Sequence, residues 1–242
     1  MIVEFMGAQV VPSPIRHFDQ ELDQLKSKLL AMSALVESAI YRSITAAVQK
    51  DRALAAEVLQ NEARVNRMEI EIDDQAISLL ALQQPMAGDL RLITSAIKIN
   101  NDLERMGDLA VNIAQRALAL MDEPMVQPLI DIPHIGALVQ NMVRKALDAF
   151  VTKDAELAQS VLASDDAVDN LRTAFFHELI SFMQRESSHV PQGLNLLSIV
   201  RNLERIADHA TNIAEDVVFY IKGIDVRHHA EAVAGVTPEP RA

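Results

Sequence analysis

The chain of 242 residues has no cysteine and no tryptophan, and only 4% of its residues are aromatic. Without cysteine it can form no disulfide, no thiolate metal site and no cysteine nucleophile. The shortage of aromatic residues disfavours a β-protein, because these residues are enriched in strands. No apolar run approaches 18 residues without a charge, so no transmembrane helix is expected.

Half of the residues are hydrophobic, and the net charge is −12 with a pI near 5.0. Alanine, leucine, isoleucine, valine and methionine dominate, alongside glutamate, glutamine and arginine, and most of these are good helix formers. The basic footprint of a nucleic-acid-binding protein is missing. The N-terminus has no basic region followed by an apolar core, so it does not resemble a secretory signal. We expect a cytoplasmic protein that reaches a membrane only through partner proteins.

Apolar residues recur at three-four spacing through most of the chain, which predicts amphipathic helices. Proline and glycine mark the breaks. The expected helices cover residues 17–50, 51–84, 89–121 and 134–152, a segment starting at Asp154, and a last helix that begins after Pro191 and Gly193 and ends at Lys222 with Gly223 as its C-cap. Asp51 is expected to cap the second helix.

Two stretches of the chain are repeated. LERMGD at 103–108 returns as LERIAD at 203–208, and QKDRALAAEVL at 49–59 is echoed by TKDAELAQSVL at 152–162. The sequence therefore predicts an all-α protein made of two tandem antiparallel three-helix bundles related by an approximate twofold. The expected divisions are an N-terminal arm (1–16), a first bundle (17–122), a linker (123–133), a second bundle (134–223) and a C-terminal tail (224–242).

Each copy of the repeated motif places two carboxylates four residues apart, as Glu104 with Asp108 and as Glu204 with Asp208. Residues at this spacing share a helix face, and like charges there cost a few tenths of a kcal/mol. The helical phase puts the first pair on a partly apolar flank, which favours a bound cation. The alternative is a solvated helix face with surface ion pairs to the neighbouring arginines.

Further oxygen-bearing side chains follow helical spacing on the helices expected to pack beside these motifs. They are Glu62, Asn66, Glu69 and Asp73 in the first half, Asp165 and Asp169 in the second, and Asn112 and Asn212 one turn beyond the two motifs. Oxygen ligands suit magnesium, manganese or iron. Because carboxylates can bridge, the site is expected to hold more than one ion, with the asparagines as ligands or as groups that orient them.

In NNDLERMGDLAVNIA, RNLERIADHATNIAEDVVFYIKG, QQPMAGDLRLI, EARVNRMEIEID and DDAVDNL the chain resembles the PhoU family, from about residue 17 to residue 229. The resemblance implies two similar three-helix bundles whose surfaces carry multinuclear iron or zinc clusters. The positions that match the family's metal motifs are Glu104, Asp108, Glu204, Asp208, Asp165 and Asp169. The second helix departs from the motif, with Glu62 followed by Asn66 and a further pair at Glu69 and Asp73.

The resemblance also implies a regulatory role without enzymatic activity. Proteins of this family link the ATPase subunit of the phosphate ABC transporter to a sensor histidine kinase and restrain the phosphate-starvation response. We expect a homodimer. Two alternatives stay open: a metal-free helical adaptor, and a di-iron carboxylate enzyme, which would need Glu-x-x-His pairs on two helices. The chain offers one such pair, Glu186 and His189.

Overall fold

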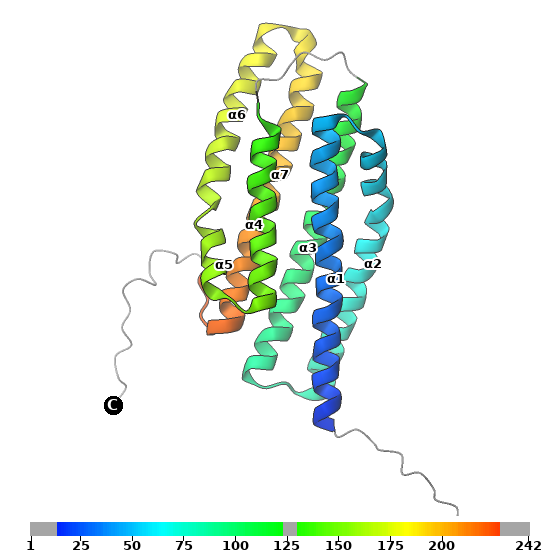
Figure 1. The fold of residues 1–242 in the computed structure, drawn as a ribbon, viewed down its shortest axis with the longest axis vertical. Helices are drawn as coiled ribbons and strands as arrows, with labels where there is room; N and C mark the ends of the chain where they lie inside the picture. The colour runs from blue at the N-terminus through cyan, green and yellow to red at the C-terminus, as the bar shows by residue number, and fades with distance from the viewer. Residues whose placement is uncertain (1–13, 123–129, 228–242) are drawn as a thin grey trace, which may run out of the picture.

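A computed structural model describes residues 14–122 and 130–227 of the chain. These residues form helices connected by short turns, and no strand occurs among them (Figure 1). The elements are α1 (Pro14–Gln49), α2 (Arg52–Gln83), α3 (Ala87–Met121), α4 (Ile132–Thr152), α5 (Ala155–Leu162), α6 (Asp165–Arg185), the short η1 (Ser187–His189) and α7 (Val190–Lys222). Within the two described ranges, no helix joins the length and the low charge that crossing a bilayer requires.

Local capping explains where several helices begin and end. Asp51 accepts hydrogen bonds from the backbone N–H groups of Ala53 and Leu54, which confirms it as the N-cap of α2. Asp154 caps α5 in the same way. Gly223 ends α7 with φ of 68°, a left-handed conformation that favours glycine. The expected C-cap is therefore also confirmed.

The second half differs from the expected helices at two places. The segment that starts at Asp154 is broken near Ser164 into α5 and α6. The last helix begins at Val190, before Pro191, because a proline in the first turn sacrifices no helical hydrogen bond. Gly193 then lies inside α7, where a Cβ atom would come within 2.4 Å of Met183 Cγ, so glycine permits this close packing.

The predicted arm, linker and tail lie largely outside the described residues, at 1–13, 123–129 and 228–242. Where the chain is described, α1 begins at Pro14 rather than at residue 17. The helix expected from residue 134 begins at Ile132, and Pro133 stands in its first turn instead of in the linker. Both corrections follow from the tolerance of a helix N-terminus for proline.

The tandem three-helix arrangement is confirmed, and the two halves meet through equivalent helices. Helix α3 packs on α7 along the centre of the molecule, with α2 at one edge and α6 at the other (Figure 1). The repeat register holds in the core, where Ile99 and Ile199, and Leu103 and Leu203, are all fully buried. The core is continuous through both halves.

Polar contacts also cross between α3 and α7. Lys98 Nζ lies 2.7 Å from Asp216 Oδ1, and Ser95 Oγ donates to the Asp216 carbonyl oxygen at 3.2 Å. Arg91 Nε donates to the carbonyl oxygen of Tyr220 at 3.3 Å. As the α3 residue number rises the α7 partner number falls, so the two helices run antiparallel.

We expect Lys98→Ala to lower the free energy of unfolding by about 2 kcal/mol, measured by urea denaturation at pH 7. The Asp216 side chain is only 8% exposed, and it would lose its cation. A buried pair broken in this way costs roughly 3–5 kcal/mol, and the partial exposure of Lys98 reduces the loss.

The deficit should shrink as the pH falls. Burial raises the pKa of Asp216 even beside Lys98, so without the lysine the neutral carboxyl is favoured further. A carboxyl group whose pKa is raised by folding does not destabilise the protein below its unfolded pKa, near 3.8. Its destabilising effect grows as the pH rises through its folded pKa. The control is Lys145→Ala, which removes a half-buried lysine of α4 that has no ion pair among the described residues. Equal losses in both variants would contradict this account.

Candidate carboxylate site

The two motif pairs lie on α3 and α7. The pair on α3 faces α2, and the pair on α7 faces α6. Glu104 and Glu204 are half-buried, whereas Asp108 and Asp208 are exposed. This agrees with the predicted flank position, between the buried seam and the solvent. Helix α2 packs on α3 and α6 packs on α7, which brings a second acidic helix to each pair.

In the first half, three carboxylates influence one another. Burial raises the pKa of Glu104, and the charges of Asp108 and Glu69 raise it further. Arg105 and His209 act in the opposite direction. Glu69 on α2 therefore joins the α3 pair, and we call Glu69, Glu104 and Asp108 the first cluster.

In the second half, five carboxylates from two helices interact. Burial raises the pKa of Asp165, followed by the charges of Asp169, Asp208 and Asp166. Burial also raises the pKa of Asp208, followed by Glu204 and Asp169. We call Asp165, Asp169, Glu204 and Asp208 the second cluster. The repeated motif predicted Glu204 and Asp208, and helical spacing on the neighbouring helix predicted Asp165 and Asp169.

The two clusters are not identical copies. Arg172 of α6 lies 3.5 Å from Glu204, whose side chain is only 16% exposed. The repeat offset of 103 residues places Glu69 at the position that corresponds to Arg172. At this position the first cluster receives a carboxylate from α2, whereas the second cluster receives a guanidinium group from α6.

The remaining predicted residues lie outside the two clusters. Asp73 Oδ1 accepts a hydrogen bond from Asn100 Nδ2 at 3.0 Å, inside the first bundle. Asn212 Nδ2 donates to Asp102 Oδ1 at 3.3 Å, across the seam. Glu62 and Asn66 are half-buried and Asn112 is exposed, and none of these three has an ion pair or hydrogen bond to a side chain in residues 14–122 or 130–227.

A contact between the halves was not predicted. His209 Nδ1 lies 2.7 Å from Asp102 Oδ1, and both side chains are largely buried. The positive charge of a protonated His209 opposes the rise in the pKa of both Glu104 and Asp208. Sequence spacing showed only that His209 points away from Asp208. It carried no signal that Asp102, 107 residues earlier, would face it.

The donor chemistry of both clusters fits a hard cation, because crowded carboxylates with raised pKa values gain from a nearby positive charge. As the side chains stand, however, no three carboxylate or imidazole groups within the described ranges converge on a point where they could hold a metal ion. Metal binding would therefore require carboxylate side chains to rotate toward one another.

The Glu186–His189 pair has a structural role. The His189 ring stacks on Phe182 with 4.3 Å between centroids, and its Nδ1 lies 3.2 Å from the Phe182 carbonyl oxygen. These contacts fix the turn between α6 and α7. The pair lies at a helix end, which does not suit the bundle-core site of a di-iron enzyme.

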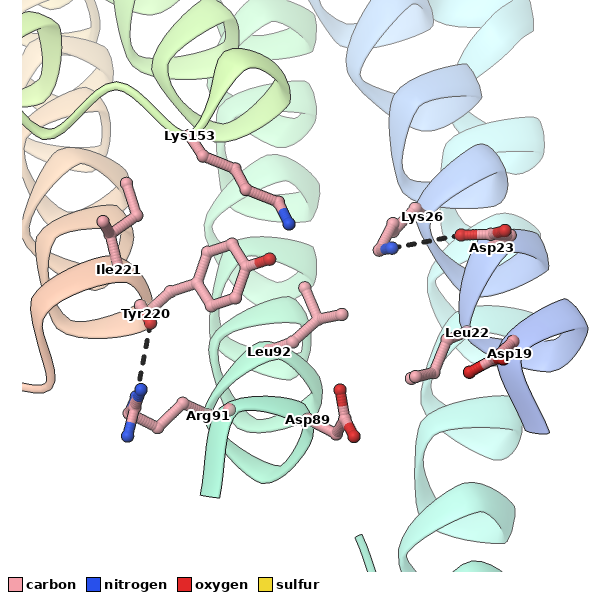
Figure 2. Close-up of a pocket in the computed structure, with 11 residues that line it drawn as sticks. Asp19, Leu22, Asp23, Lys26, Asp89, Arg91, Leu92, Lys153, Tyr220 and Ile221 are labelled. Atoms are coloured by element: carbon pink, nitrogen blue, oxygen red, sulfur yellow. Dashed lines mark hydrogen bonds and ion pairs between the residues drawn. The ribbon is translucent and has the colours of Figure 1, made fainter. Parts of the chain in front are cut away.

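A cavity of about 510 Å³ opens where the two halves meet beside the start of α3. Figure 2 shows Lys153 and the Tyr220 hydroxyl pointing into it from one side and Lys26 from the other, with Asp89 below. Three cationic and three acidic side chains line this cavity: Lys26, Arg91, Lys153, Asp19, Asp23 and Asp89. Because the charges balance, the cavity selects neither anions nor cations, and the two clusters remain the stronger candidate site.

Comparison with known proteins gives matches along most of the chain. A sequence model of the PhoU domain matches twice, at residues 29–117 and 132–217. The chain is 42% identical over 214 residues to proteins of Pseudomonas putida and Pseudomonas aeruginosa, both named phosphate-specific transport system accessory protein PhoU homolog. These matches cover 88% of this chain, and 84% and 88% of the two relatives respectively.

Solved structures agree with the sequence matches. The crystal structure of PhoU from Pseudomonas aeruginosa superposes with a TM-score of 0.83 at 41% identity, over 86% of this chain and 100% of that one. The phosphate transport system regulatory protein PhoU from Streptococcus pneumoniae gives a TM-score of 0.79 at 31% identity, over 86% and 99% of the two chains.

We expect Asp208→Asn to stabilise the protein in the presence of a metal chelator, by about 0.5 kcal/mol at pH 7. The raised pKa of Asp208 means that its ionisation costs stability as pH rises from its unfolded value of 3.8 through its folded pKa. The advantage of asparagine should therefore vanish near pH 4. Urea denaturation at both pH values measures it.

Asp148→Asn is the matched control, because Asp148 is an exposed carboxylate of α4 outside both clusters. If both variants gain equally at pH 7, charge crowding in the second cluster does not explain the effect.

Proposed function

The chain belongs to the PhoU family, and we propose that it is an accessory regulator of a phosphate transport system. In this role it acts in the cytoplasm as a negative regulator of the phosphate-starvation response. It links the ATPase subunit of the phosphate ABC transporter to a sensor histidine kinase and modulates phosphate uptake. Family membership makes it an accessory protein rather than an enzyme.

The single observation that carries this proposal is the two-fold match to the PhoU domain, supported by a fold shared over nearly the full length of two PhoU structures. The matched segments contain every residue of both clusters. A helical body with acidic clusters on its flanks suits a protein that acts by binding partners.

We further propose that both clusters bind metal ions. Glu69, Glu104 and Asp108 would hold ions in the first half, and Asp165, Asp169, Glu204 and Asp208 in the second. Glu62 and Asn66 stay candidate ligands because they occupy the α2 positions that correspond to Asp165 and Asp169. Iron or zinc follows from the family, and oxygen donors also suit magnesium or manganese.

Burial and then mutual repulsion raise the pKa of Glu104, Asp165 and Asp208, and bound cations would offset both effects. Neutralised carboxylates would draw α2 to α3 and α6 to α7, and the two faces would become more rigid. A defined surface of this kind would be available to the transporter or to the kinase, according to the transport state.

A metal-free adaptor is the second candidate function, favoured by the lack of three converging donors in the described part of the chain. Elemental analysis by plasma mass spectrometry separates the two, on protein purified without an affinity tag. Stoichiometric metal that survives gel filtration supports the metal-binding proposal, and protein without metal supports the adaptor.

We expect the double variant Glu104→Ala/Asp108→Ala to lose the metal of the first cluster and to derepress phosphate-responsive genes in high phosphate. Removing two of three carboxylates leaves too few oxygens for a hard cation. A promoter reporter in a strain that lacks the native gene measures repression, and elemental analysis measures metal.

The control Glu71→Ala/Asp74→Ala removes two exposed carboxylates of α2 that lie outside the cluster. It should keep both metal and repression. If the cluster variant also keeps both, the first cluster has neither role.

A further inference from the structure

An open groove lies between helices α6 and α7 in the second half of the molecule. It has a volume of about 410 Å³ and is lined by Arg172, Phe176, Leu197, Val200 and Arg201. Phe176 is 41% exposed, although aromatic side chains are scarce in this chain and usually bury large areas. We call these five residues the α6–α7 groove.

The apolar character of the groove continues along α7. Val190, Leu194, Leu197 and Arg201 follow each other at spacings of four, three and four, so they share one helix face. Leu194 is 55% exposed, and Val190 is also exposed. An apolar row therefore leads into the groove and ends at a guanidinium group.

The first half of the molecule provides an internal comparison. At the positions equivalent to Phe176 and Val200 it has Asp73 and Asn100. Asn100 is buried, and its Nδ2 donates to the Glu69 carbonyl oxygen at 2.9 Å and to Asp73 Oδ1 at 3.0 Å. These bonds join α2 to α3, and a valine at the same position can form none of them.

In the first half, hydrogen bonds between α2 and α3 occupy this junction of the three-helix scaffold. Glu69 and Asn101 occupy the positions that correspond to Arg172 and Arg201. The second half has exchanged a polar, acidic and hydrogen-bonded junction for an apolar and basic one that lines a groove. A change of register does not explain this exchange, because Ile99 and Leu103 and their counterparts Ile199 and Leu203 are buried in both halves.

The charge of the groove is opposite to that of the chain. The protein has a net charge of −12, yet two arginines line this groove. Arg172 has Glu204 at 3.5 Å. Arg201 is exposed and has no hydrogen-bond or ion-pair partner from its side chain among residues 14–122 and 130–227. A free guanidinium next to an apolar surface favours a carboxylate carried on an apolar segment.

We propose that the α6–α7 groove docks an acidic amphipathic helix of a partner protein. The apolar face of that helix packs on Phe176, Leu197 and the row toward Val190, and its carboxylates pair with Arg201 at the rim. This is the helix-in-groove mode of recognition. The inference deepens the proposed accessory role by naming the surface and the partner chemistry, and it does not depend on metal binding.

The first test replaces Phe176 by the photo-crosslinking residue benzoylphenylalanine in the full-length protein, expressed in its native host. Mass spectrometry then identifies the captured peptide. We expect one protein segment with acidic and bulky apolar residues at helical spacing. The control carries the same crosslinker at Ile77, an exposed apolar residue of α2, and should not capture that segment.

The second test measures affinity for the captured protein, purified, by biolayer interferometry. Arg201→Glu should weaken binding at least tenfold, because it places a carboxylate against carboxylates. Arg116→Glu, an equal charge change at an exposed arginine of α3, should leave the affinity within twofold. Thermal melts of both variants check that each is folded.

Capture of a basic segment, of a second copy of this chain or of nothing overturns the docking proposal, as does full affinity in Arg201→Glu. The proposed function is judged separately. If the captured protein is neither a transporter subunit nor a kinase, and repression survives loss of the gene, the accessory role fails while the groove remains a docking site.

Discussion

The apolar packing of α3 against α7 is the interaction on which the rest of the structure depends. Each fully buried leucine or isoleucine in this seam contributes about 1.5–3 kcal/mol relative to an exposed one. Ile99, Leu103, Ile199 and Leu203 are all fully buried. Because each of these helices also belongs to the core of its own bundle, the seam joins two bundles into one body. It also fixes which flanks of the two helices remain available for acidic side chains.

The same seam brings the two acidic clusters under a common influence. His209, held against Asp102 at 2.7 Å, lowers the pKa of Glu104 on one helix and of Asp208 on the other. A carboxylate pair on each half is therefore not electrically isolated. The contact of His209 on α7 with Asp102 on α3 links the halves through a polar pair inside an apolar seam.

The repeat preserves the core and changes the surface. Ile99 and Leu103 and their counterparts Ile199 and Leu203 stay buried and apolar in both halves, since a bundle loses stability quickly when its core is altered. At the junction of the outer helix with the central one, by contrast, Asn100 is replaced by Val200 and Glu69 by Arg172. The first half uses this junction for internal hydrogen bonds, and the second leaves it open. Such exchanges distinguish the two halves, together with the break between α5 and α6 that α2 lacks.

Sequence alone determined what depends on local spacing. Helical periodicity, the cap at Asp51, the repeat and the flank position of the carboxylate pairs all follow from residues within one or two turns of each other. The tertiary structure alone decided which flanks meet. The Asp102–His209 contact and the approach of Arg172 to Glu204 depend on how helices rotate against one another. If a helix rotated about its own axis, the spacing of its residues along the chain would stay the same, but their partners on the neighbouring helix would change. No local pattern in the sequence could therefore specify these contacts.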